Sequence, residues 1–353
     1  MIKQFLSFLK KEFKHIYRDS RTMLILLIMP MVMIYLFGFA ITTEVKNSRV
    51  ALIDQAKDEY SQQIRQAIDA NAYFSVVQDK EDYDNLPDLL QSGKADVLVL
   101  ISKEHEIQLL TDGSEPNMAQ SRAGYLQRIL QGQEQDSYAE DFDVTSRMLY
   151  NPQLKSEYNF VPGLIGMLIL LVCAMMTSLS IVKEKEMGTM EVLLASPLHP
   201  LTIIVAKLIP YFVVSCVNLI TVLLLAEFVL NVPVEGSVAV LLGISVVYIL
   251  VSLLLGLLIS IAVNTQLAAM FISLLLIIPT MYLSGWTFPI ESMSETLQHV
   301  SCLVPARWYM DATRKIMIQG AEAQYIWKDF AVLCLDCVAL MAISWKLFKT
   351  RLE

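Results

Sequence analysis

Two acidic residues, Glu227 and Asp336, interrupt long apolar stretches of this 353-residue sequence. Glu227 lies near the end of the third such stretch, and Asp336 lies five residues into the sixth. A carboxyl group inside a membrane-length segment can carry protons, or it can form an ion pair. Of these two roles we favour the ion pair, with Arg314 or Lys315 as the candidate partner.

Other reactive residue types point to little chemistry. Cys334 and Cys337 have C-x-x-C spacing, but they lie in an apolar stretch, which favours packing over redox or metal chemistry. His105 stands between two glutamates and predicts a solvated turn rather than a metal site. The one Gly-Lys pair, Gly93 with Lys94, lacks the rest of the phosphate-binding pattern G-x-x-x-x-G-K-[ST]. We therefore expect a chain that is not itself an enzyme, with no metal, cofactor or nucleic acid bound to it.

The composition places the chain in a membrane. Hydrophobic residues make up 55% of it, and the mean hydropathy is +0.51. A transmembrane helix needs about 20 apolar residues to cross a hydrocarbon core of roughly 30 Å. Six stretches meet that length: 23–41, 161–182, 208–230, 238–263, 267–286 and 331–348. The predicted fold class is a polytopic α-helical membrane protein with six transmembrane helices.

Basic residues indicate the orientation of these helices. Clusters of them precede the first span and follow the last, at Lys3, Lys10, Lys11, Lys14, Arg18, Arg21, Lys346, Lys349 and Arg351. Because Lys and Arg concentrate on the cytoplasmic side, both termini are predicted to be cytoplasmic. The segments 43–160 and 287–328 then face outward, and the segment 184–200 faces the cytoplasm.

The acidic charge belongs to one hydrophilic segment. The whole chain carries −8, whereas residues 44–157 contain 21 acids and 11 bases. Short β-like runs at 49–54, 73–77, 95–102 and 107–113 alternate there with helical patterns at 58–70, 83–91 and 117–131. A segment of this length can form its own core. We therefore predict an inserted α/β domain over 43–160 on the extracytoplasmic side.

The N-terminal segment is predicted to be an amphipathic helix at the membrane surface. Its apolar residues recur at helical spacing and its lysines lie opposite them. The predicted organisation is this interfacial helix over 1–22, a first transmembrane helix over 23–42, the α/β domain, and five more transmembrane helices within 161–353.

The sequence between the second and third spans, "KEKEMGTMEVLLASPLHPLTIIVAK", combines charges, a glycine and two prolines. Gly188 can end the preceding helix, and Thr189 can cap a short new one with Glu191 in its first turn. Pro197 would end that helix. A helix so short, with exposed leucines, is unstable by itself, and we expect it to dock on a partner.

This stretch resembles a motif of the ABC-2 type membrane subunits of ATP-binding cassette exporters, E-x-G-T-x-E-x-L-x-x-S/T-P. Further similar segments follow in order: "FVPGLIG", "LISIAVNTQLAAM", "LSGWTFPIESM" and "LVPARWYMDATRKIMIQG". The leader and the inserted domain resemble the bacterial drug-exporter-like branch of that family, with a type V exporter-like fold.

The resemblance implies a permease subunit of the bacterial inner membrane that works as a homodimer or heterodimer. ATP and Mg²⁺ would bind a separate ATPase subunit, and the cargo would be amphiphilic or drug-like. Membrane lipid is an expected partner, and an envelope adaptor protein is a further one. The segment 184–200 would be the coupling helix that contacts the ATPase, through Glu186, Gly188, Thr189, Glu191, Leu193, Leu194, Ser196 and Pro197.

The resemblance also implies a translocation path lined by the second and fifth spans. Candidate lining residues are Met167, Met175, Met176, Met270, Phe271 and Met281. The segment 287–328 would dip back into the membrane from outside.

Two alternatives from other classes stay open. One is a proton-coupled secondary transporter that uses Asp336 or Glu227, and the other is a membrane receptor or scaffold whose outer domain binds a ligand. A gene for an ATPase beside this one would favour the exporter subunit over both.

Overall fold

The computed structural model describes residues 2–18, 20–40, 48–71, 73–79, 89–90, 94–111, 116–134, 155–190 and 200–350. The chain divides into two compact units. Unit 1 comprises Met1–Ile41 and Glu157–Glu353, and unit 2 comprises Thr42–Ser156.

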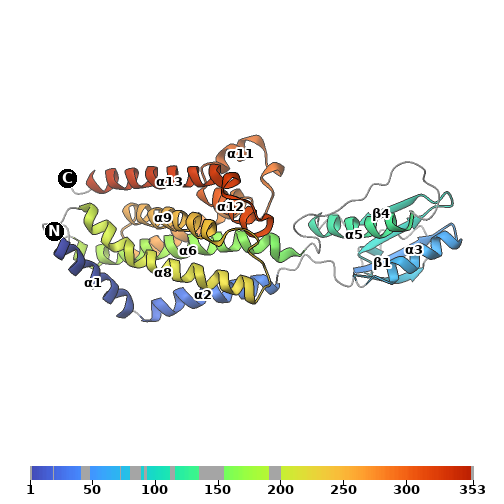
Figure 1. Ribbon diagram of the computed structural model, residues 1–353, viewed down its shortest axis with the longest axis horizontal. Coiled ribbons are helices and arrows are strands. Elements are labelled where there is room, and N and C mark those ends of the chain that lie inside the picture. The colour runs from blue at the N-terminus through green and yellow to red at the C-terminus, as the bar shows by residue number, and fades with distance from the viewer. Residues whose placement is uncertain are drawn as a thin grey trace. The chain divides into compact units, whose positions relative to one another are not determined.

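Unit 1 is a bundle of long helices (Figure 1). Within the described residues, five helices are long and apolar enough to cross a membrane. These are α6 (Ser156–Glu186), α8 (Pro200–Phe228), α9 (Val238–Ala262), α10 (Gln266–Leu283) and α13 (Ala323–Thr350). The chain is therefore a helical membrane protein with about five candidate spans.

Two helices precede these spans. Helix α1 covers Ile2–Arg18, and α2 covers Ser20–Ala40, where the first span was predicted. The shorter stretch Leu27–Leu36 of α2 is apolar, but it is below the length of a full span. The predicted first span, which would bring the number of spans to six, therefore stays a prediction.

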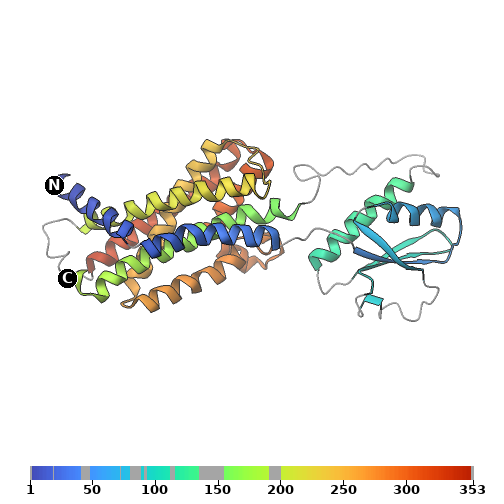
Figure 2. The same cartoon turned by 90° about the horizontal axis from the view of Figure 1, so that it is seen from below.

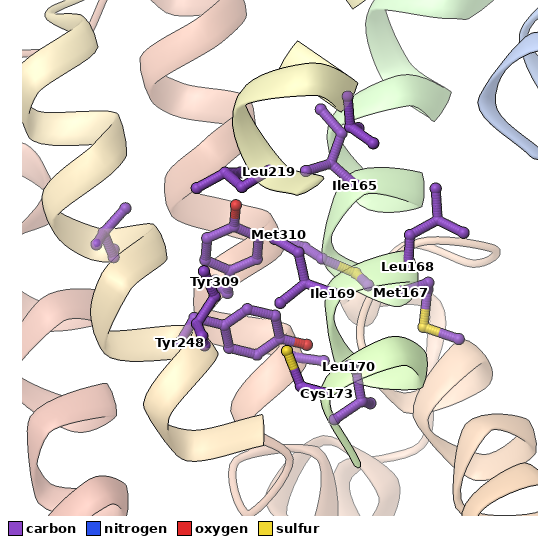
Figure 3. Close-up of a cluster of buried hydrophobic side chains, with 14 of the residues drawn as sticks. Ile165, Met167, Leu168, Ile169, Leu170, Cys173, Leu219, Tyr248, Tyr309 and Met310 are labelled. Atoms are coloured by element: carbon purple, nitrogen blue, oxygen red, sulfur yellow. The ribbon is translucent and has the colours of Figure 1, made fainter. Parts of the chain in front are cut away.

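Helix α6 lies at the centre of unit 1. In α6, 72% of the apolar stretch is buried, whereas the buried share is 28% in α8, 17% in α10 and 11% in α13. Figure 3 shows its residues Ile165, Ile169 and Cys173 beside the stacked rings of Tyr248 and Tyr309. The two ring centroids are 4.1 Å apart. The exposed helices present apolar side chains, as helices in contact with lipid do.

The buried hydroxyl groups of Tyr248 and Tyr309 have hydrogen-bond partners within this core. The hydroxyl of Tyr248 donates to the carbonyl of Gly166 at 3.2 Å, and the Tyr309 hydroxyl lies 2.9 Å from Ser245 Oγ. A buried hydroxyl without such a partner would be costly in an apolar core. These bonds join α6, α9 and the later helix α12 (Pro305–Gln319), and they fix how the three pack.

Three short helices connect α10 to α13. They are η2 (Ile290–Ser292), α11 (Glu295–Ser301) and α12 (Pro305–Gln319). Helix α12 buries Tyr309, Met310, Ile316 and Met317 in the core of unit 1. The segment predicted to be re-entrant is thus partly packed among the long helices.

The last helix begins at Ala323, whereas the sequence predicted the sixth span from residue 331. Lys328 and Asp329 interrupt the apolar pattern, and the predicted span therefore began after them. In the structure the Lys328 ammonium lies 5.5 Å from the Trp308 ring centroid, and Asp329 pairs with Lys315. Satisfied charges allow the helix to continue through them.

Unit 2 is built on a four-stranded sheet with the order β2-β1-β3-β4. The strands are β1 (Ser48–Asp54), β2 (Phe74–Asp79), β3 (Val97–Ile101) and β4 (Ile107–Thr111). Strand β1 pairs in parallel with β2 and β3, and β3 pairs antiparallel with β4.

Helices α3 (Glu59–Asp69) and α5 (Pro116–Glu134) lie on the same side of this sheet (Figure 2). Ile64 and Ile68 of α3 and Leu126 of α5 pack there against alternate residues of the strands, such as Val50 and Leu52. The other face carries a smaller core around Ala51, Leu89 and Leu98. The predicted strands and two of the three predicted helices overlap these elements, while most of the third, 83–91, falls outside the described residues.

Candidate functional site

The candidate site lies where α6 ends and the segment with the quoted motif begins. The backbone N–H of Gly188 donates to the carbonyl of Lys185 at 3.0 Å, and Gly188 has a φ of +69°. Only glycine adopts this left-handed conformation at little cost, and it commonly ends an α-helix. The glycine of the motif therefore sets the point at which the chain leaves α6.

The next residue closes the same helix end. The Thr189 hydroxyl donates to the carbonyl of Glu184 at 3.1 Å. The side chain thus satisfies a carbonyl that the end of α6 leaves without an intrahelical partner. The N-cap interaction predicted for Thr189 would fall on residues outside the described ones.

Two charged residues attach the end of α6 to the junction between α9 and α10. The Lys185 ammonium donates to the carbonyl of Ser260, and also to that of Val263 at 3.3 Å. These carbonyls belong to the C-terminal end of α9, where a cation is favourable. Glu186 Oε2 accepts a bond of 2.5 Å from Gln266 Nε2 at the start of α10. The base of the motif is therefore held to two other spans.

A buried group of charges, missed from the sequence, lies beside this helix end. The Lys207 ammonium of α8 is 2.5 Å from Glu184 Oε2 of α6 and 3.7 Å from Glu12 Oε2 of α1. The contacts are close ion pairs without hydrogen-bond alignment. The lysine inside the apolar run "IIVAKLIP" is the one signal in the sequence that could have revealed it.

The predicted coupling residues divide into two groups. Glu186, Gly188 and Thr189 are described, and all three are exposed. The predicted residues Glu191, Leu193, Leu194, Ser196 and Pro197 lie outside the described residues, as does the docking helix expected there.

The predicted path residues do not share one environment. Met167 is buried in the core of unit 1, and Met281 is partly buried and packs against that core. Met175, Met176 and Met270 are half-buried, whereas the Phe271 side chain is largely exposed on α10. Helices α6 and α10 do meet, because Ser178 Oγ lies 3.1 Å from Ser273 Oγ. A common lining therefore stays a prediction.

The two intramembrane acids occupy different positions. Glu227 is exposed at the end of α8. Asp336 lies in the middle of the candidate span Ala323–Leu347, deeper than the sequence suggested, because α13 begins earlier. Its Oδ2 atom is buried without a hydrogen-bond partner.

The cations expected to pair with Asp336 have other partners in the described part of the chain, and the pairing stays a prediction. The Lys315 ammonium pairs with Asp311 at 2.6 Å and with Asp329 at 3.2 Å. Arg314 donates to the carbonyl of Gly285 at 3.4 Å. The acceptors of Lys315 thus lie on α12 and α13, and that of Arg314 lies just after α10.

Metal chemistry has no support in the described part of the chain. No group of three or more His, Cys, Asp or Glu side chains lies there in an arrangement that could hold a metal ion. The site is a set of helix ends that charged side chains join to one another.

Comparison with known proteins adds a family and several relatives. Residues 21–346 match the family described as ABC-2 family transporter protein. The chain is 29% identical to the probable multidrug ABC transporter permease YbhS of Escherichia coli, over 97% of this chain and 96% of that protein. It is 28% identical to the permease YbhR of the same organism, over 97% of each. The inner membrane transport permease YhhJ of Escherichia coli is 26% identical over 72% of this chain and 68% of its own length.

Proposed function

This chain belongs to the ABC-2 family of transporter permeases, and we propose that it is the membrane subunit of an ATP-driven exporter. Two permease chains would enclose the path, as the same chain twice or with a sister chain. ATP and Mg²⁺ would bind a separate ATPase subunit. The segment 184–200 would dock on that subunit and pass its motion to the spans.

The observation that carries the proposal is the anchoring of the motif at its base. Lys185 and Glu186 bind the end of α9 and the start of α10, and Gly188 directs the chain out of α6 immediately afterwards. A docking segment transmits motion only if its base moves together with the spans. Because three spans meet at this base, a displacement of residues 189–200 would reach all of them.

The cargo class is proposed from the relatives. YbhS and YbhR are named probable multidrug permeases, and we extend to this chain an amphiphilic or drug-like cargo. The exposed apolar faces of α8, α10 and α13 support a setting in lipid. We further propose six spans in a bacterial inner membrane, cytoplasmic termini and unit 2 on the outer side, where an envelope adaptor could bind.

The test changes one leucine of the proposed docking segment. Burying a leucine is worth about 1.5 to 3 kcal/mol, so Leu193→Asp should weaken binding of the ATPase on the order of tenfold or more. The measurement is co-purification with a co-expressed ATP-binding cassette ATPase from the same genome, together with ATP hydrolysis in lipid vesicles. Glu191→Lys should act in the same direction, because a base opposes the positive end of a helix.

The matched control is Leu297→Asp, which places the same change on an exposed leucine of α11. It should leave ATPase binding unchanged. Equal binding by Leu193→Asp and the unmodified chain would refute the docking assignment. If no ATPase co-purified, and a proton gradient alone drove uptake or efflux of Hoechst 33342, the secondary transporter would replace the exporter, with Asp336 as the carrier to test.

A further inference from the structure

The buried charges beside the candidate site belong to three different helices. Glu12 comes from α1, Glu184 from α6 and Lys207 from α8. The side chains of Glu12 and Lys207 are each 3% exposed and that of Glu184 is 11% exposed. Outside this cluster, the exposed Lys11 ammonium lies 3.5 Å from Glu12 Oε1. Lysines and glutamates thus alternate from the surface to the end of α6, in the order Lys11, Glu12, Lys207 and Glu184.

Charges in such a place are poorly explained by stability alone. Removing a charge from water is costly, and replacing a buried ion cluster by uncharged side chains of similar volume is often neutral or stabilising. Buried ion pairs can instead select one arrangement of the elements that carry them. In this cluster the selected arrangement is the position of α1 relative to α6 and α8.

Few of the described side chains of helix α1 are buried. Among its described side chains only Glu12 and Ile16 are fully buried, and Leu6 and Phe13 are exposed. Apolar contacts are non-directional and would allow α1 to slide or rotate along α8. A carboxylate that must meet one ammonium sets both the rotation and the axial position of the helix.

We propose that Glu12 and Lys207 are positioning residues that hold α1 against the base of the coupling segment through Glu184. Glu184 lies two residues before Glu186, which binds Gln266, and four before Gly188. Helix α1 would therefore move with the ends of α6 and α8 whenever the docking segment is displaced. This last step rests on the proposed function, whereas the placement of α1 does not.

The placement is tested on the permease alone in lipid nanodiscs. Spin labels at Lys14→Cys on α1 and Val213→Cys on α8 occupy exposed positions, in a background whose native cysteines are replaced and whose thermal midpoint is retained. The unmodified cluster should give one narrow distribution of label distances. Glu12→Gln leaves the pair of Lys207 with Glu184 intact, and it should at least double the width of that distribution.

A second variant separates placement from stability. Lys207→Met alone leaves two carboxylates buried together, and it should lower the thermal midpoint on the order of 10 °C. Adding Glu12→Gln and Glu184→Gln should restore the midpoint but not the narrow distribution. A narrow, unshifted distribution in Glu12→Gln or in the triple variant would overturn the proposal.

The chain also offers a matched control. Lys315 lies between Asp311 and Asp329 and forms another cluster of one lysine and two acids. Replacing these three by Met, Asn and Asn should leave the distances from α1 to α8 unchanged. In complex with the ATPase, Glu12→Gln should also reduce the stimulation of ATP hydrolysis by the permease severalfold. If Glu12→Gln broadened the distance distribution but did not reduce the stimulation of ATP hydrolysis, that result would count against the proposed function. The placement of α1 would still stand.

Discussion

At the scale of single residues, several described cations of unit 1 bind acceptors within the protein. Lys185 binds carbonyls at the end of α9, and Arg307 donates to the carbonyl of Gln298 at 2.9 Å. Lys315 pairs with two aspartates. In the predicted topology the cations between α10 and α13 face outward, against the rule that basic residues concentrate on the cytoplasmic side. Internal partners explain why they are tolerated there.

In unit 2, one carboxylate connects two strands and a helix. Asp96 Oδ2 accepts from the backbone N–H of Arg49 at 2.8 Å and from its Nε at 3.2 Å, and Arg122 lies 3.6 Å from Oδ1. Burial raises the pKa of Asp96, but the bonds from Arg49 and the charges of both arginines outweigh this effect. The pKa is lowered below its ordinary value of 3.8.

We predict that Asp96 makes unit 2 less stable in acid. Because its pKa is lower in the folded state, its contribution is fully present above pH 4 and is lost as the pH falls through the lowered pKa. Asp96→Asn should reduce the free energy of unfolding by about 1 to 2 kcal/mol at pH 7 and flatten its dependence on pH below 4. Urea unfolding at a series of pH values measures both, with the exposed Glu104→Gln as control. An unchanged acid slope in Asp96→Asn would contradict the assignment.

At the scale of elements, α6 and α9 approach closely at a glycine. A Cβ atom added to Gly256 would lie 2.5 Å from the carbonyl oxygen of Ala174 and 2.9 Å from its Cα. Small residues at such crossings let helix backbones pack in a membrane, where van der Waals contact drives association. Helices α6 and α9 can therefore pack this closely only because residue 256 is a glycine and has no side chain.

A pair of substitutions in α9 tests this contact. Gly256→Ala should destabilise the protein by about 1 to 3 kcal/mol, because backbone atoms of α6 must move. Gly243→Ala in the same helix meets no atom within 4 Å, and it should be neutral or stabilise by up to about 1 kcal/mol. Thermal unfolding in detergent compares the two variants, and equal midpoints would show that α6 and α9 do not pack as described.

At the scale of the whole molecule, the two units have separate cores. The core of unit 2 contains Val50, Ile64, Val97 and Leu126, all from within Thr42–Ser156. The five cysteines lie in unit 1 and are free, so no disulfide stabilises unit 2. A segment with its own core and sheet satisfies the physical requirements for independent folding.

We predict that residues 42–156 fold when expressed without the helices. Circular dichroism should show mixed helix and strand, and urea should unfold the segment in one cooperative transition. Replacing Ile64 by Asp in the same segment is the control, because a charge in that core should abolish the transition. A gradual, non-cooperative change in the unmodified segment would mean that unit 2 requires unit 1.

The sequence by itself determined the features that depend on neighbouring residues. Apolar length placed five of the long helices, the glycine at 188 marked the end of α6, and short β-like runs located the strands of unit 2. The order of several short motifs also indicated the family that the comparison then showed. Each of these signals is contained in a short window, because helix and strand formation are largely local.

Only the tertiary structure decided which distant residues meet. Glu12 and Lys207 form an ion pair although they are nearly 200 positions apart in the sequence. Lys315 pairs with Asp311 and Asp329, whereas the sequence analysis named it as a candidate partner of Asp336. The same pairing let α13 begin at Ala323, eight residues before the predicted span, which placed Asp336 at mid-span. A charge in an apolar run shows that a partner is needed, but packing of the helices selects the partner.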